Sequence, residues 1–138
     1  MSMRRIWKYS VLAGVILSVC GCGRPNLIGT DAAVYSRGQL YAVANQDMNS
    51  VYEATVKALE QLELEIIENA KDVFYAKIVG KIADGRTVTI RIEPGANKIT
   101  NISIKASKFL SGNEERARVI YTQIKLNLRA STNTSDDK

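Results

Sequence analysis

The chain of 138 residues contains no histidine, and this absence narrows the chemistry open to it. Histidine is the commonest general base in enzymes. Because the chain has none, a catalytic pair of serine or cysteine with histidine is excluded. "GKIADGRT" (80–87) lacks the glycine spacing and the final residues of a phosphate-binding P-loop. Carboxylates such as Glu53, Glu60 and Asp84 lie where surface charges are expected. The sequence therefore predicts a protein that is not an enzyme and has no cofactor; a hydrolase with a carboxylate site is the enzymatic alternative.

Cysteine is scarce as well, since Cys20 and Cys22 are the only two. One residue separates them, whereas a redox pair has two intervening residues. A structural zinc site needs four thiol or imidazole ligands, and the chain has no further cysteine and no histidine to supply them. The sequence predicts neither a redox centre nor a metal site.

A long apolar run is also missing. "VLAGVILSVC" (11–20) has ten residues, whereas a transmembrane helix needs about 20. The basic residues Arg4, Arg5 and Lys8 precede this run, and the small residues "GCG" follow it closely. This order is typical of an export signal, which we predict over residues 1–21.

"VCGC" is similar to a bacterial lipobox, in which the lipidated cysteine becomes the new N-terminus. Cys22 fits this role because the small Gly21 precedes it, whereas modification of Cys20 would place Val19 at the peptidase site. We predict lipidation of Cys22 and attachment to a membrane through this N-terminal lipid. In Gram-negative lipoproteins an aspartate after the cysteine favours the inner membrane. Gly23 stands there instead, so the prediction is the outer membrane with the domain facing the periplasm.

The positive charge is concentrated before the predicted domain. The chain has 19 basic and 14 acidic residues, for a net charge of +5. Three of the basic residues lie in the predicted signal, so removal of the signal leaves 16 basic and 14 acidic residues, a net charge of +2. A nucleic-acid interface needs a strongly basic stripe. We therefore predict no nucleic-acid partner.

The rest of the chain is long enough for one domain. Residues 22–38 are rich in Gly, Pro, Asn and Thr without regular periodicity, which predicts a tether. Residues 39–129 carry the regular apolar patterns of a globular domain. Residues 130–138 are polar and predict a disordered tail.

Apolar periodicity within the domain predicts two helices and a sheet of about five strands. Val88, Ile90 and Ile92 alternate with polar residues, as in a half-buried strand. Asp84 and Gly85 predict a two-residue hairpin turn. The fold class is α+β, a two-layer sandwich with an antiparallel sheet and the order β-α-β-β-β-β-α. Strands are predicted at 39–45, 64–68, 73–82, 87–93 and 100–107, together with one helix from Asp47 to about Leu62 and another from Ser111 to about Leu128.

Asp47 is the predicted N-cap of the first helix, with Ser50 and Glu53 as a rival capping box, and Ser111 opens the second helix with Glu114 at capping-box spacing. The apolar stripes predicted to be buried are Val51, Thr55, Ala58, Leu59 and Leu62 in the first helix and Ala117, Ile120, Ile124 and Leu128 in the second.

The outward positions of these strands form the candidate binding face. It combines hydroxyl side chains with four cations, Lys77, Lys81, Arg91 and Lys105. Such a face suits an acidic patch of an envelope protein, an anionic glycan or lipid head groups. The alternatives are an ordinary solvated face and a carrier that holds a lipid or other apolar ligand between sheet and helices. The oligomeric state is not predicted.

Residues 40–128 resemble an uncharacterised family of small bacterial lipoproteins, domain-of-unknown-function family 3568. The phrases that carry the resemblance are "VYEATVKALEQLELEI", "AKIVGKIADGRTVTIRIE" and "NISIKASKF". The family has no established function, so the resemblance implies no site residue. The layout is also similar to small periplasmic lipoprotein domains of helix-grip type, including accessory lipoproteins of outer-membrane assembly, and this likeness implies the fold alone.

Overall fold

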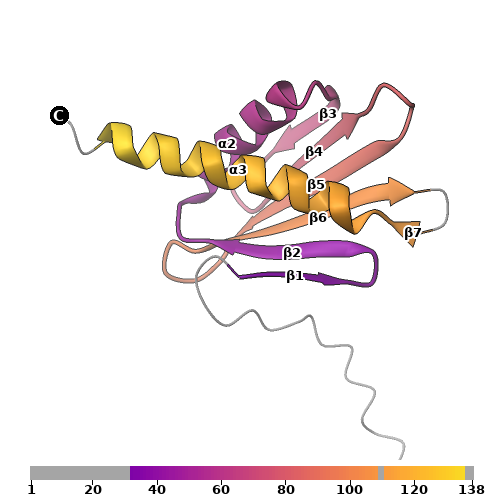
Figure 1. The fold of residues 1–138 in the computed structure, drawn as a ribbon. Coiled ribbons are helices and arrows are strands. Elements are labelled where there is room, and N and C mark those ends of the chain that lie inside the picture. The colour runs from indigo at the N-terminus through magenta and orange to yellow at the C-terminus, as the bar shows by residue number, and fades with distance from the viewer. Residues whose placement is uncertain (1–31, 109–110, 136–138) are drawn as a thin grey trace, which may run out of the picture.

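The described residues form an antiparallel sheet with two helices on one face, here called the inner face; the other is the outer face (Figure 1). The structure is a computed structural model and describes residues 32–108 and 111–135. Six strands follow the order β1-β2-β6-β5-β4-β3, and β7 pairs with the end of β6. The predicted α+β sandwich is confirmed. The elements are β1 (Ala33–Ser36), β2 (Gln39–Ala44), α2 (Met48–Gln61), β3 (Glu65–Lys71), β4 (Ala76–Lys81), β5 (Thr87–Pro94), β6 (Thr100–Lys108), β7 (Ser111–Gly112) and α3 (Glu114–Ser135).

Helix α2 begins at the predicted cap. The backbone N–H groups of Asn49 and Ser50 donate to Asp47 Oδ1 at 2.9 and 3.1 Å, which satisfies two donors of the first turn. At the other end, Glu63 adopts a left-handed conformation with φ 57°. Its N–H donates to Glu60 O, and the N–H of Leu64 donates to Leu59 O. These two bonds close the helix and turn the chain into β3.

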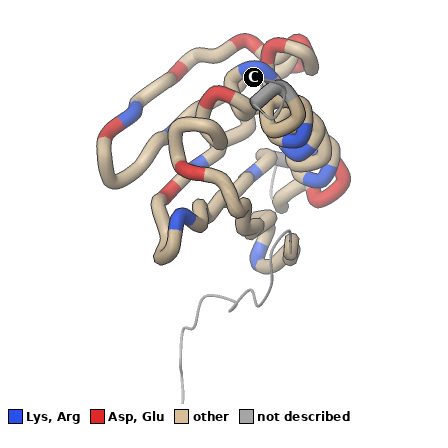
Figure 2. The backbone as a smooth tube through the Cα atoms, turned by 90° about the vertical axis from the view of Figure 1, so that its left-hand side faces the viewer, with Lys and Arg blue, Asp and Glu red and all other residues tan. Residues whose placement is uncertain are grey.

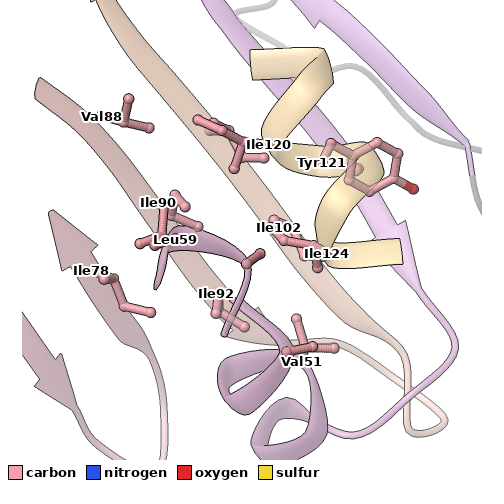
Figure 3. Packing of buried hydrophobic residues seen from close by; sticks show 14 of the residues in the cluster. Val51, Leu59, Ile78, Val88, Ile90, Ile92, Ile102, Ile120, Tyr121 and Ile124 are labelled. Atoms are coloured by element: carbon pink, nitrogen blue, oxygen red, sulfur yellow. The ribbon is translucent and has the colours of Figure 1, made fainter. Parts of the chain in front are cut away.

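The core lies between the helices and the inner face of the sheet, as Figure 3 shows. Side chains at helical spacing on both helices meet every second side chain of the central strands, including Ile78, Ile90 and Ile104, each 0 % exposed. A polar contact joins the helices: Asn127 Nδ2 donates to Ala54 O at 3.2 Å and to Gln61 Oε1 at 2.9 Å. The helix residues buried here are Val51, Ala54, Thr55, Ala58, Leu59, Ala117, Ile120, Tyr121, Ile124 and Leu128.

The chain termini of the domain differ from the prediction. Residues 33–36, which we placed in the tether, form β1 and pair with β2. The hairpin closes through Arg37 and Gly38, both at positive φ (52° and 79°), as a two-residue primed turn requires. Helix α3 continues to Ser135, so residues 130–135 of the predicted disordered tail are helical.

Three internal boundaries also differ. Asn113, and not Ser111, caps α3, because its Oδ1 accepts the N–H of Arg116 at 3.1 Å, while Ser111 belongs to β7. The β3–β4 turn spans 72–75, so β3 is longer than predicted and β4 begins later. The β4–β5 loop has three residues, 83–85, because Ile82 pairs with Arg86 around it.

Antiparallel pairing sorts the loops onto two ends of the sheet. The proximal end is the one at which the chain enters β1; it carries the β3–β4 turn (72–75), the β5–β6 loop (95–99) and the C-terminal end of α3 (Figure 1). The distal end carries the β1–β2 turn and the β4–β5 loop. Among the described residues, no helix is long and apolar enough to cross a membrane.

Candidate functional site

The outer face of the sheet carries all four predicted cations. Lys77 and Lys81 alternate along β4 with the buried Ala76 and Ile78, so they point away from the helices. The register pairs Lys77 with Arg91, and Arg91 with Ser103. Directly opposite residues of an antiparallel pair share a face. The structure therefore brings together the residues that the sequence placed on one face, listed here in full: Lys77, Lys81, Arg91 and Lys105.

Two glutamates that the sequence did not place on this face lie beside two of the cations. The register of β3 against β4 shifts between Ile66 and Glu68, and the extra residue of such a bulge inverts the alternation that follows it. Glu65, which precedes the shift, lies opposite Lys81, and the shift places Glu68 on the outer face as well. Glu68 accepts both hydrogen bonds of Lys77 Nζ, at 2.8 and 3.0 Å. The face is less basic than the cations alone indicate.

A central quartet remains, formed by Thr89 and Arg91 of β5 with Lys105 and Ser103 of β6. Thr89 lies opposite Lys105, and Arg91 lies opposite Ser103, so the two cations stand on a diagonal with a hydroxyl beside each. Arg91 and Lys105 are exposed, and neither forms an ion pair with another described residue. Glu93 is the nearest acidic neighbour along β5, two residues from Arg91.

The quartet offers hydrogen-bond donors and positive charge. Arg91 has a planar fork of donors suited to a carboxylate or a phosphate, and Lys105 adds a second charge within reach. Diagonal neighbours in a sheet are about 7–8 Å apart, so one anionic group, or two adjacent ones, can contact both cations. The chemistry that this arrangement supports is reversible binding of an anion.

Carboxylates with shifted pKa values lie away from the quartet. A side-chain hydrogen bond from Arg86 lowers the pKa of Asp84 to about 2 in the β4–β5 loop. The Ser50 side chain, which donates to Asp47 Oδ2 at 2.7 Å, lowers the pKa of that capping carboxyl. Both shifts favour the charged form, whereas a general acid requires the opposite. Over residues 32–108 and 111–135, no group of three or more Cys, Asp or Glu side chains is placed to hold a metal ion.

A second surface feature is a shallow groove of about 340 Å³ between α3 and β1. Sequence reasoning missed it, although Arg118, Thr122, Lys125 and Arg129 recur at the spacing of one helix face. Arg118 already pairs with Glu114 Oε1 at 2.7 Å, and Lys125 Nζ lies 5.7 Å from the centre of the Tyr121 ring. The groove is lined by Ala33, Arg118, Tyr121, Thr122, Lys125, Leu126 and Arg129.

The lipidation site and the cleaved segment predicted over 1–21 fall outside the described residues, as does the part of the tether before residue 32. Their assignment rests on the sequence. The structure does show where the described chain enters the fold, because residue 32 leads into Ala33 of β1 at the proximal end.

Comparison with known proteins places the chain in a family without adding an activity. No curated protein matches the chain. A family model described as "Protein of unknown function (DUF3568)" matches residues 6–127, which include all three phrases that carry the resemblance noted in the sequence. Since the match extends over most of the 138 residues, the chain belongs to the DUF3568 family.

Proposed function

We propose that this protein is a lipid-anchored, non-catalytic binding module of the bacterial cell envelope, attached through Cys22 and taking an anionic group of a partner on the central quartet. The proposed location is the periplasmic side of the outer membrane, since Gly23 follows Cys22. The anionic group is a carboxylate or a phosphate, carried by an envelope protein, a glycan or a lipid.

One observation carries the binding part of this proposal. Neither helix of the described residues lies over the outer face (Figure 1), and its two central cations, Arg91 and Lys105, form no ion pair with a described residue. If the outer face served only to remain in contact with water, paired charges such as Lys77 and Glu68 would be sufficient. An anionic group of a partner would bind between these two cations, Arg91 and Lys105, at the centre of the sheet.

The core favours a binding module over a carrier of an apolar ligand. Side chains from α2, α3 and the inner face occupy the space between the two layers (Figure 3). Ile120 and Ile124 of α3 are each 1 % exposed or less. A carrier would instead enclose a cavity of several hundred Å³ between these layers.

The anchoring part is tested with the Cys22→Ala variant, produced from the full-length gene in a Gram-negative host. We expect the parent protein to carry acyl chains on its mature N-terminus by mass spectrometry and to remain with the membrane fraction. The variant should keep its signal unprocessed and lack the acyl mass. The control is Cys20→Ala, which should be lipidated like the parent. A parent protein without acyl mass would contradict the anchor.

The binding part is tested by charge reversal on the two faces of the domain. Arg91→Glu and Lys105→Glu, singly and together, should abolish the partner cross-links that the lipidated parent forms in intact envelopes. Lys57→Glu is the matched control, because Lys57 is an exposed cation on α2 and belongs to the other layer. If the double variant keeps every cross-link of the parent, the quartet is only solvated surface.

A further inference from the structure

The β3–β4 turn exposes apolar side chains that the fold does not use. Val73 and Phe74 are each 76 % exposed, and Tyr75 is 42 % exposed. The turn itself is held by the backbone and by Asp72: the Asp72 N–H donates to Tyr75 O at 2.8 Å, and the Val73 N–H donates to Asp72 Oδ1 at 2.6 Å. Turns favour Gly, Pro, Asn and Asp for conformational reasons. Valine and phenylalanine at its tip therefore require an explanation outside the folding of the domain.

The turn lies at the proximal end, where the chain enters the fold. With the order β1-β2-β6-β5-β4-β3 and strands about 4.8 Å apart, roughly 20–24 Å separates β1 from the β3–β4 turn. The ten residues 23–32 between Cys22 and β1 can extend over at most about 35 Å. A domain attached at Cys22 can therefore rest its proximal end on the bilayer surface.

We propose that Val73 and Phe74 insert into the head-group region of the bilayer to which Cys22 is attached, with Tyr75 at the interface. This inference rests on the lipid anchor proposed above. Exposed phenylalanine and tyrosine suit this depth, because each presents an apolar ring at the boundary between water and acyl chains. The insertion orients the domain, so that the outer face stands upright from the membrane and stays open to the periplasm.

Charge alone does not distinguish this end. Figure 2, which looks onto the proximal end, shows cations and anions interspersed over it. Lys71 Nζ lies 4.4 Å from the centre of the Tyr52 ring, and Lys77 pairs with Glu68. Lysines flanking an inserted tip can reach lipid phosphates while their stems stay against apolar surface. The apolar tip is therefore the feature that selects a lipid surface.

A protein that adds a strand to the β3 edge fits the structure less well. The bulge between Ile66 and Glu68 interrupts the ladder that such a strand would extend. Charged side chains at Glu65, Glu68 and Lys71 also follow this edge, and charges on an edge strand oppose further pairing. Ile67 is 52 % exposed, but it lies at the bulge and away from the turn.

The experiment uses tryptophan fluorescence of the full-length, lipidated protein. Trp7 is the only tryptophan and belongs to the predicted signal, so mature Phe74→Trp has a single reporter at the tip. The matched control is Val119→Trp, because Val119 is 51 % exposed on α3 near the distal end. Each purified variant is reconstituted in vesicles of phosphatidylethanolamine and phosphatidylglycerol, with and without bromine on the acyl chains, and its N-terminal mass is measured.

We expect acyl mass on both variants, a blue-shifted emission for Phe74→Trp that brominated lipid quenches because the side chain reaches the boundary of the acyl chains, and no quenching for Val119→Trp. Acyl mass without quenching of Phe74→Trp overturns the insertion and leaves the anchor intact. A blue shift without bromine quenching would mean that the tip contacts another protein or a second copy of this chain, and this result also overturns the insertion. Equal quenching of both variants overturns the orientation. Absence of acyl mass and of vesicle binding overturns anchor and insertion together.

Discussion

From Val88 to Ile92 in β5 and from Ile102 to Ala106 in β6, every second residue is apolar and almost completely buried on the inner face of the sheet. The residues between them, on the outer face, are charged or carry hydroxyls. Ile90 is 0 % exposed, while its neighbour Arg91 is exposed. Burial of apolar area stabilises a fold far more than solvated surface contacts do. The inner face therefore specifies the fold, and the outer face is free to vary in charge and to bind.

Of the substitutions that test this difference between the two faces, one on the inner face should have the largest effect on stability. Ile90→Ala should reduce the free energy of unfolding by about 2–5 kcal/mol, because it leaves a cavity in the fully buried core under α2. Thr89→Ala, one residue away on the outer face, should change it by no more than about 0.5 kcal/mol. Urea denaturation followed by circular dichroism measures both. Equal losses for the two variants would contradict the separation of the faces.

A smaller effect is expected at the cap of α2, the helix that covers part of the inner face. Asp47→Ala should cost about 1 kcal/mol at neutral pH, because two N–H groups lose their acceptor. The pKa of Asp47 is lowered from 3.8 in the folded protein, so its charge-dependent stabilisation is present above pH 3.8 and is lost as the pH falls through the folded-state pKa.

The matched control for the cap is Asp47→Asn, since asparagine also caps helices but does not titrate. The difference in stability between the parent and Asp47→Ala should narrow in urea titrations below about pH 4. The difference between Asp47→Asn and Asp47→Ala should stay nearly constant over the same range. A gap that widens in acid would contradict the sign of the pKa shift.

The smallest effect is expected at the outer-face ion pair. Lys77 and Glu68 have side chains that are 32 % and 48 % exposed, and exposed pairs of this kind contribute about 0–1 kcal/mol. A double-mutant cycle with Lys77→Ala and Glu68→Ala should give a coupling of this size that declines as salt is raised from 0.05 to about 0.5 M. A larger coupling that is independent of salt would mean that the outer face also stabilises the fold.

The sequence predicted the fold wherever one periodicity held without interruption. Ile90 and Ile92 in β5, and Ile102 and Ile104 in β6, all point inward as expected. The Asp47 cap and the buried stripes of both helices were also predicted. These features depend on local spacing, which a single sequence displays directly.

Features that depend on tertiary contacts were not predictable in this way. Strand β1 is only four residues long, and Arg37 is an unusual residue at positive φ in the turn that closes it. The bulge at Ile66 and Glu68 changes the face of the residues after it, and alternation carries no sign of that change. For this reason the four cations of the candidate site were predicted, whereas the position of Glu68 beside them was not.

The path of the strands determines where labels can be attached. Because the described chain enters and leaves the fold at the proximal end (Figure 1), a fluorescent protein fused after Ser135 begins at the same end of the sheet as Ala33. The β4–β5 loop lies at the opposite end, and no non-neighbouring heavy atom comes within 4 Å of a Cβ placed on Gly85. An epitope inserted there is separated from the tether by the length of the sheet, roughly 25 Å. Antibody access to the two positions in spheroplasts thus tests the proposed orientation of the domain on a membrane.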